Sequence, residues 1–239
     1  MVVLYRQAGK VWQRIGMTEV IMDNLNPSWV KSFDVQYHFE RRENYKVEVY
    51  DIDDMNNLMN FKGHDFVGSL EFALHEVVTS RDQTLERPLE NAQRGAGKNG
   101  TIKIIGEERN MSNMEEVLMK MKVNFAATGN MNFFLIHKQI GQNQWKPIYK
   151  SELQGSKKGF TEWNLVNVLA SDMAGEADVE REVRIDFYIS QKSGNHKHCG
   201  MVSLTLAQLK ENTTEFPLTD KKGKPLKEQK LTFVKLDVK

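Results

Sequence analysis

The sequence predicts an all-β protein made of two antiparallel β-sandwiches. Apolar residues alternate with polar ones over short stretches along the whole chain, which is the pattern of half-buried strands. Helical periodicity nowhere extends beyond about three turns, and 239 residues are enough for two domains of ordinary size. These observations favour sandwiches over an alternating β/α fold.

The expected elements follow the chain in order. Strands share the period-two alternation and are expected at residues 33–39, 45–49, 70–72 and 102–104, then at 118–125, 133–136, 183–187 and 231–236. Short helices are expected at residues 74–80, from Glu86 onward and at residues 206–210. Residues 91–100 contain glycines among polar residues and are expected to form a loop, and residues 108–113 are the expected domain boundary.

Composition narrows the class of protein. Lys and Arg number 33 and Asp and Glu number 32, and this balance excludes a strongly basic nucleic-acid binder. A single cysteine, Cys199, cannot form an intrachain disulfide or a thiolate zinc site, so a reducing, cytoplasmic setting fits best. The longest apolar runs are far below the roughly 18 residues of a membrane span, so any membrane contact is expected to be peripheral.

Carboxylates gather where the strand expected at residues 45–49 ends. Asp51 and Asp53 project to one side of an extended chain, and the returning chain can bring Asp65 beside them. Carboxylate oxygens are the ligands that Ca²⁺ prefers. An isolated Asp-x-Asp is also common at solvated strand ends, so these residues alone leave both interpretations open.

A second group of motifs bears on this choice. The motifs are Thr18-Glu19-Val20, Leu25-Asn26-Pro27-Ser28-Trp29, Tyr50-Asp51-Ile52-Asp53 and His64-Asp65-Phe66-Val67-Gly68. Their order and spacing resemble the signature of C2 domains, the calcium-dependent lipid-binding β-sandwiches. The resemblance implies that Asp51, Asp53, Asp65 and the backbone carbonyl of Ile52 bind Ca²⁺. It also implies that Pro27 fixes a turn between strands.

The order of the parts resembles the copines, cytosolic proteins with two tandem C2 domains followed by a von Willebrand A-like domain. Residues 1–110 look like a first C2 domain without its opening strand, and residues 114–239 look like a second, so the fold expected is two tandem C2-type Greek-key sandwiches. The opening strand, the first calcium loop and the von Willebrand A-like domain are not found in the chain. The resemblance therefore implies a truncated copine.

The second half departs further from the family pattern. Ile189, Gln191 and Lys197 stand at the three carboxylate positions of the second domain. Its first loop, at residues 126–131, also contains no carboxylate. A calcium site without anionic oxygens is not expected there.

Two sets of residues are candidates for membrane contact. Apolar residues at the tip of the acidic loop are expected to enter the membrane interface, with ordinary loop packing as the alternative: Met55, Leu58, Met59 and Phe61. Lysines of the second half are expected to meet anionic headgroups, with a solvated face as the alternative: Lys146, Lys150, Lys157 and Lys158. On a C2 sandwich, Lys146 and Lys150 would lie on one strand and share a face.

Other chemistries fit the sequence less well. The run His196-Lys197-His198-Cys199 contains zinc-ligand types, but neighbours this close cannot easily point at one ion. The sequence contains no nucleophile-elbow or phosphate-loop motif, so an enzyme is not expected. Aromatic and basic residues form no recurring platform for nucleic acid.

The sequence therefore predicts a non-enzymatic, copine-type protein whose first domain binds Ca²⁺ and docks on anionic phospholipid. Such a protein would move from the cytoplasm to a membrane, most simply the plasma membrane, when calcium rises, and target proteins are further possible partners. The rival prediction is a calcium-independent protein-interaction scaffold. In that scaffold the two halves, of net charge −3 (residues 1–107) and +4 (residues 108–239), pair with each other or with partners.

Overall fold

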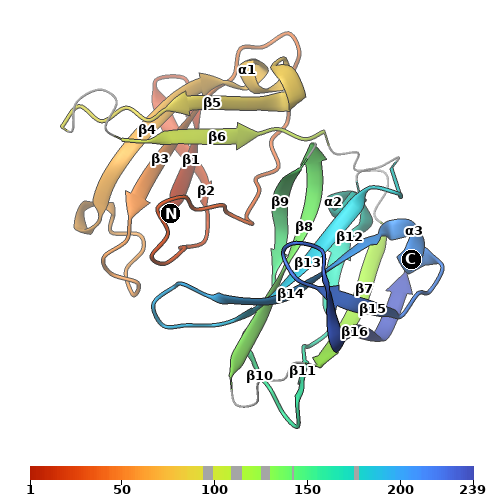
Figure 1. The fold of residues 1–239 in the computed structure, drawn as a ribbon. Helices are drawn as coiled ribbons and strands as arrows, with labels where there is room; N and C mark the ends of the chain where they lie inside the picture. The colour runs from red at the N-terminus through yellow and green to blue at the C-terminus, as the bar shows by residue number, and fades with distance from the viewer. Residues whose placement is uncertain (94–98, 109–114, 125–129, 142, 175–177) are drawn as a thin grey trace. The chain divides into compact units, whose positions relative to one another are not determined.

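The computed structural model describes residues 1–93, 99–108, 115–124, 130–141, 143–174 and 178–239 (Figure 1). The chain divides into two compact units, each described here by itself. Unit 1 comprises Met1–Ile21 and Lys31–Glu108, and unit 2 comprises Met22–Val30 and Arg109–Lys239. All but the first residue of the boundary expected at residues 108–113, and most of the loop expected at residues 126–131, lie outside the described residues.

Unit 1 contains a four-stranded antiparallel sheet with the strand order β2-β1-β3-β4 (Figure 1). Its strands are β1 (Val2–Ala8), β2 (Val11–Met17), β3 (Asn44–Asp51) and β4 (Asp65–Ala73). Alternate residues are buried in two strands that were predicted from the sequence: Tyr45 and Val47 in β3, and Leu70 and Phe72 in β4. The period of two read from the sequence therefore selects the buried face of this sheet correctly.

A two-stranded sheet completes unit 1. It pairs β5 (Thr84–Pro88) with β6 (Thr101–Ile105), and one residue from each strand, Leu85 and Ile102, is buried. Directly after β5, Glu90 exchanges two backbone hydrogen bonds with Ser69 of β4. These bonds tie the two sheets of unit 1 together at this end.

The strand expected at residues 33–39 does not form. Residues 31–38 have no regular secondary structure, although their apolar and polar residues alternate. The ring of Phe33 lies against Gly16 of β2, so close that a Cβ at Gly16 would be 2.8 Å from it. Phe39 is 88% exposed. Apolar and polar residues do alternate in this segment, but it packs on unit 1 through the Phe33 ring and does not pair with a strand.

Unit 2 is built on one large antiparallel sheet with the strand order β10-β8-β13-β14-β15-β16-β7-β11, to which β9 and β12 add through β8 and β7. The strands before the helix α2 (Ala170–Ala174) are β7 (Glu116–Asn124), β8 (Met131–Gly141), β9 (Gln144–Lys150), β10 (Gln154–Gly155), β11 (Phe160–Glu162) and β12 (Val166–Leu169). The strands after it are β13 (Glu182–Ile189), β14 (Lys197–Thr205), β15 (Glu215–Thr219) and β16 (Pro225–Val238).

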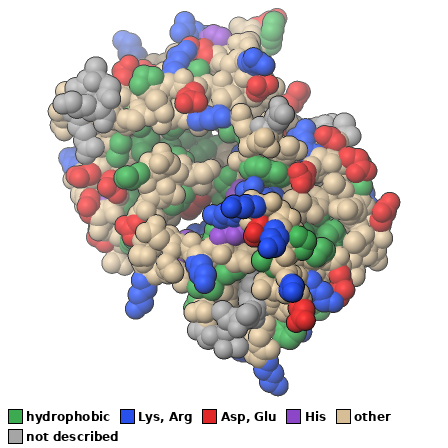
Figure 2. Space-filling view, viewed as in Figure 1, with side chains coloured by type: hydrophobic (Ala, Val, Ile, Leu, Met, Phe, Trp, Pro, Cys, Tyr) green, Lys and Arg blue, Asp and Glu red, His purple; other side chains and the backbone are tan. Residues whose placement is uncertain are grey.

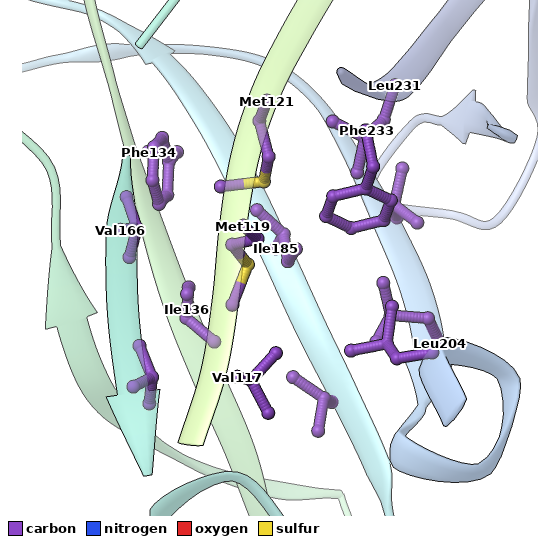
Figure 3. Close-up of a cluster of buried hydrophobic side chains, with 14 of the residues drawn as sticks. Val117, Met119, Met121, Phe134, Ile136, Val166, Ile185, Leu204, Leu231 and Phe233 are labelled. Carbon is purple, nitrogen blue, oxygen red and sulfur yellow. The ribbon is translucent and has the colours of Figure 1, made fainter. Parts of the chain in front are cut away.

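The core of unit 2 is organised around β7. Every second residue of this strand is fully buried: Val117, Met119, Met121 and Val123. Figure 3 shows Met119 and Met121 pointing among side chains from other strands, including Phe134 of β8 and Ile185 of β13. Strands that are far apart in the sequence thus share one apolar core.

Three short α-helices follow strands. Helix α1 (Leu74–Val78) and helix α3 (Leu206–Lys210) lie where the sequence predicts them. The helix expected from Glu86 onward is wrong, because Glu86 pairs with Lys103 in the β5–β6 ladder. Helix α2 (Ala170–Ala174) was not expected from the sequence.

The all-β, antiparallel fold class is confirmed. Two further 3₁₀ turns, η1 (Phe61–Gly63) and η2 (Arg81–Gln83), complete the described elements. Among the described residues, the helices are too short to cross a lipid bilayer.

Candidate metal and membrane site

Two of the three carboxylates expected to bind calcium face each other at one end of unit 1. Asp51 ends β3 and Asp65 begins β4, and the two residues form the last pair of the antiparallel ladder. A register shift between Val49 and Tyr50 precedes this pair. Directly opposite residues on one face have Cβ atoms roughly 4.5–5.5 Å apart, so the two carboxylates are close neighbours. Figure 2 shows carboxylate side chains over this end of unit 1.

The third carboxylate does not join them. Asp53 lies beyond the strand end, and its side chain is exposed. Among the described residues, no three side chains of the His, Cys, Asp or Glu type lie close enough together to hold a metal ion. The donor chemistry of Asp51 and Asp65 fits a hard cation. The arrangement, however, brings two anionic ligands together, and Asp53 and the carbonyl of Ile52 would have to complete the set.

A buried histidine organises the loop between β3 and β4. His64 is 7% exposed, and its Nδ1 accepts a hydrogen bond from the backbone N–H of Asp53 at 3.3 Å. Its Nε2 lies 3.2 Å from the carbonyl oxygen of Asn57. His64 is part of a motif in the sequence, but the sequence alone predicted no role for it. Its position directly before Asp65 was the available signal.

The tip of this loop exposes two of the four apolar residues expected to enter a membrane. Met55 and Met59 are each 50% exposed, and the sulfur of Met59 lies 3.4 Å from Nη1 of Arg14. Leu58 and Phe61 are only partly exposed. The ring of Phe61 packs on that of Tyr50, with centroids 5.1 Å apart. Two methionines therefore form the exposed apolar tip.

The equivalent ladder positions of unit 2 hold no carboxylates. The ladder between β13 and β14 also ends after a register shift, and its last pair is Ile189 with Lys197. This pair corresponds to Asp51 and Asp65 of unit 1. Gln191, two residues beyond Ile189, occupies the place of Asp53. The strand register thus agrees with the positions read from the sequence.

The two lysines expected to share one face of β9 do not share it. Lys150 pairs with Leu135 of β8, and Lys146 pairs with Lys138, with a register shift between the two pairs. Leu135 and Lys138 are three positions apart on β8, so their side chains lie on opposite faces. Lys146 and Lys150 therefore also lie on opposite faces, and the shared face is a wrong prediction.

The other two lysines lie outside β9. Lys157 and Lys158 form the exposed turn between β10 and β11. Lys157 exchanges backbone hydrogen bonds with Phe160, and Lys158 has a φ of 52°. The ring of Phe160 is 43% exposed, so this turn presents two charges beside an apolar side chain.

A buried carboxylate on β13 accounts for His198, one of the two histidines considered as zinc ligands. Asp186 lies 2.9 Å from Nε2 of His198, 3.0 Å from Nδ1 of His137 and 2.7 Å from Nε of Arg184. Burial alone would raise the pKa of Asp186. That pKa is nevertheless held well below its usual range by the adjacent His137 ring, the hydrogen bond from His198 and the guanidinium of Arg184. His198 thus pairs with a carboxylate instead of joining Cys199 in a metal site.

Comparison with known proteins agrees with this geometry. The family model described as C2 domain matches residues 1–89. Nicotinic receptor-associated protein 1 of Caenorhabditis briggsae is 37% identical over 106 residues, which are 41% of this chain and 16% of that protein. The same-named protein of Caenorhabditis elegans is 36% identical over 108 residues, which are 41% of this chain and 17% of that protein. The chain thus spans a small part of these relatives.

Two solved structures are also similar. BON1-C2B has a TM-score of 0.45 and 14% identity, and the match covers 56% of this chain and 99% of that one. The pair of C2 domains of Extended-Synaptotagmin 2 has a TM-score of 0.30 and 14% identity, over 100% of this chain and 84% of that one. The family match and the antiparallel sheets of unit 1 lead to one conclusion: residues 1–89 of this chain form a C2 domain.

Proposed function

We propose that the chain is a copine-type, calcium-dependent peripheral membrane protein that binds anionic phospholipid through the loop between β3 and β4. The C2 domain and the similarity to nicotinic receptor-associated protein 1, a copine-family protein, support this proposal. It assigns binding rather than catalysis to the chain. It also implies movement from the cytoplasm to a membrane, the plasma membrane in the first instance, when calcium rises.

The observation that carries the proposal is the pairing of Asp51 with Asp65 beside an exposed apolar loop tip. In the proposal, these carboxylates hold Ca²⁺, and Asp53 and the carbonyl of Ile52 complete the protein ligands. When bound, calcium would supply the positive charge that offsets the carboxylates and attracts lipid phosphate. Met55 and Met59 would enter the interface, while Leu58 and Phe61 support them from the packed side of the loop.

The lysines of unit 2 would add a calcium-independent attraction. Each Lys near an anionic surface contributes about 1 kcal/mol. Lys157 and Lys158 are exposed together in one turn, whereas Lys146 and Lys150 are divided between two faces of β9. We therefore assign the larger contribution to the turn, which is a change from the strand face expected from the sequence.

Vesicle co-sedimentation of the whole chain tests the proposal. Vesicles containing phosphatidylserine should bind the protein in Ca²⁺ and release it in chelator. Asp51→Asn with Asp65→Asn should abolish the calcium-dependent fraction. Asp82→Asn is the matched control, because Asp82 is an exposed carboxylate outside the loop. Equal binding of the native chain in Ca²⁺ and in chelator would contradict the calcium requirement.

A calcium-independent interaction scaffold is the second candidate. Two observations favour it. The described residues bring no three ligand side chains together, and the equivalent ladder end of unit 2 carries Ile189, Gln191 and Lys197. A scaffold would bind target proteins equally well in Ca²⁺ and in chelator. The same vesicle experiment therefore separates the two candidates, since only the first requires a calcium difference.

A further inference from the structure

The same hydrogen bond occurs in the strand-end loops of both units. In unit 1, Nδ1 of His64 accepts the backbone N–H of Asp53 at 3.3 Å. In unit 2, Nδ1 of His196 accepts the backbone N–H of Gln191 at 3.1 Å. We call this arrangement, a histidine Nδ1 accepting a loop N–H, the histidine clip.

The two clips occupy equivalent places in the strand ladders. In unit 1 the last pair is Asp51 with Asp65, and in unit 2 it is Ile189 with Lys197. In each unit the N–H donor lies two residues after the first member of that pair. The histidine lies one residue before the second member. The clip therefore closes the loop at the same register in both units.

The loops agree in little else. The clip spans eleven positions in unit 1 and five in unit 2. The loop of unit 1 begins and ends with carboxylates, whereas the loop of unit 2 has none at the equivalent positions. The hydrogen bond therefore also forms in the loop that lacks the carboxylates, so it does not depend on a metal ion. It points to a role in holding the loop itself.

Each imidazole is also fixed on a second side. Because Nδ1 accepts a hydrogen bond, the proton of the neutral ring lies on Nε2. In unit 1, this Nε2–H donates to the carbonyl of Asn57 at 3.2 Å. In unit 2, the rings of His196 and Phe133 form a T-shaped pair, with centroids 4.8 Å apart. Neither ring can leave its loop without losing a second contact.

We propose that His64 and His196 are positioning residues that order the two strand-end loops without a metal ion. For His64 the inference rests on the proposed function, because it concerns the loop assigned there to membrane docking. For His196 it goes beyond that function, because the loop of unit 2 has no calcium ligands. A loop that is ordered beforehand loses less conformational entropy when it binds a surface.

The test uses the whole ¹⁵N-labelled chain in chelator and without lipid, so that it does not depend on calcium or membrane binding. Histidine ring ¹⁵N shifts should show unprotonated Nδ1 and protonated Nε2 in both residues. The amides of Asp53 and Gln191 should exchange slowly with deuterium. Failure of the proposed function, seen as no calcium-dependent vesicle binding, would leave these readouts unaffected.

Four substitutions separate hydrogen bonding from packing. His64→Leu and His196→Leu fill the space but remove the acceptor, and should speed exchange of the clipped amide by about fivefold. His64→Asn and His196→Asn place an amide oxygen near the lost Nδ1 and should keep exchange within about twofold. His75→Leu, in helix α1 outside both loops, is the matched control.

Two outcomes would overturn the inference. Protonated Nδ1 in His64 or His196 would exclude the bond on which that clip depends. Equal acceleration in the Asn and Leu variants would show that the ring acts by its volume. If a Leu variant does not fold, the tautomer measurement and the Asn variant still decide.

Discussion

Asp51 and Asp65 lie directly opposite each other in the last pair of the β3–β4 ladder. Like charges in this relationship destabilise an antiparallel sheet. The same position of the ladder in unit 2 holds Ile189 and Lys197, which do not repel each other. The two units thus differ in charge at a point where their backbones correspond.

Removing one of the facing charges should stabilise the chain when calcium is absent. We expect Asp65→Asn to raise the free energy of unfolding in chelator by roughly 0.2–1 kcal/mol, because the repulsion across the ladder is relieved. Urea denaturation in chelator measures the change. Asp82→Asn is the control and should have no effect beyond error. A loss of stability in Asp65→Asn would show that the carboxylate holds the loop by hydrogen bonds.

Asp186 should give unit 2 an acid-sensitive stability. Its folded pKa lies below that of the unfolded chain, so its stabilisation is complete above the ordinary aspartate pKa of about 3.9 and is lost as the pH falls toward the folded value. Asp186→Asn should cost roughly 2–4 kcal/mol at pH 7, because His137, His198 and Arg184 lose their anion. It should also flatten the stability curve below pH 4.

Urea denaturation of the native chain and Asp186→Asn between pH 7 and pH 3 tests this prediction. The difference between the two proteins should shrink as the pH falls. A constant difference would show that the cost comes from packing and not from the charge of Asp186.

His196 should remain neutral to a lower pH than an ordinary histidine. Burial and the charge of Lys150 lower its pKa. The neutral ring that accepts the Gln191 N–H is therefore favoured, and its stabilisation is complete above the unfolded pKa of about 6.5 and is lost as the pH falls. The charge that acts on the ring is that of Lys150 of β9.

Lys150→Gln should move the pKa of His196 upward, because a nearby positive charge is removed. Two-dimensional NMR titration of the histidine rings measures the shift. Lys230→Gln is the control, since Lys230 pairs with Glu215 elsewhere in unit 2. An unchanged pKa in Lys150→Gln would leave burial as the sole cause of the lowered value.

The contact between Phe33 and Gly16 should couple the two residues energetically. Gly16→Ala places a Cβ within 2.8 Å of the ring, so the ring has to move. We expect a loss of about 1–3 kcal/mol, as for other overpacked positions. Gly16→Ala should cost less in a chain that also carries Phe33→Leu, and a double-mutant cycle measures the difference between the two costs. Additive effects would show that the ring does not pack there in solution.

The sequence predicted most strands because burial alternates along them. In β7 every second residue is fully buried, and in β3 the alternate residues Tyr45 and Val47 are buried as well. Residues 33–39 show equally regular alternation and form no strand. Alternation reports which side chains prefer burial, but it does not report whether a neighbouring backbone is available for pairing.

The candidate site was only partly predictable for related reasons. Asp51 and Asp65 flank a strand-loop-strand segment, so antiparallel pairing brings them together. The place of Asp53 depends on a bond to His64, eleven residues away, which no local pattern reveals. Lys146 and Lys150 were assigned to one face because a regular strand has a period of two. A β-bulge adds one residue, leaves no clear mark in the sequence and reverses that assignment.

The two histidine clips also suggest where the chain tolerates foreign sequence. Each clip fixes the ends of its loop, and the span between them is eleven positions in one unit and five in the other. Lengthening a loop whose ends are already held costs little, about 0.6 kcal/mol for each doubling of its length. A peptide epitope inserted between Lys192 and Ser193 would open the turn in which the Gly194 N–H donates to the Gln191 carbonyl. The clip should still hold the two ends of the loop at the sheet.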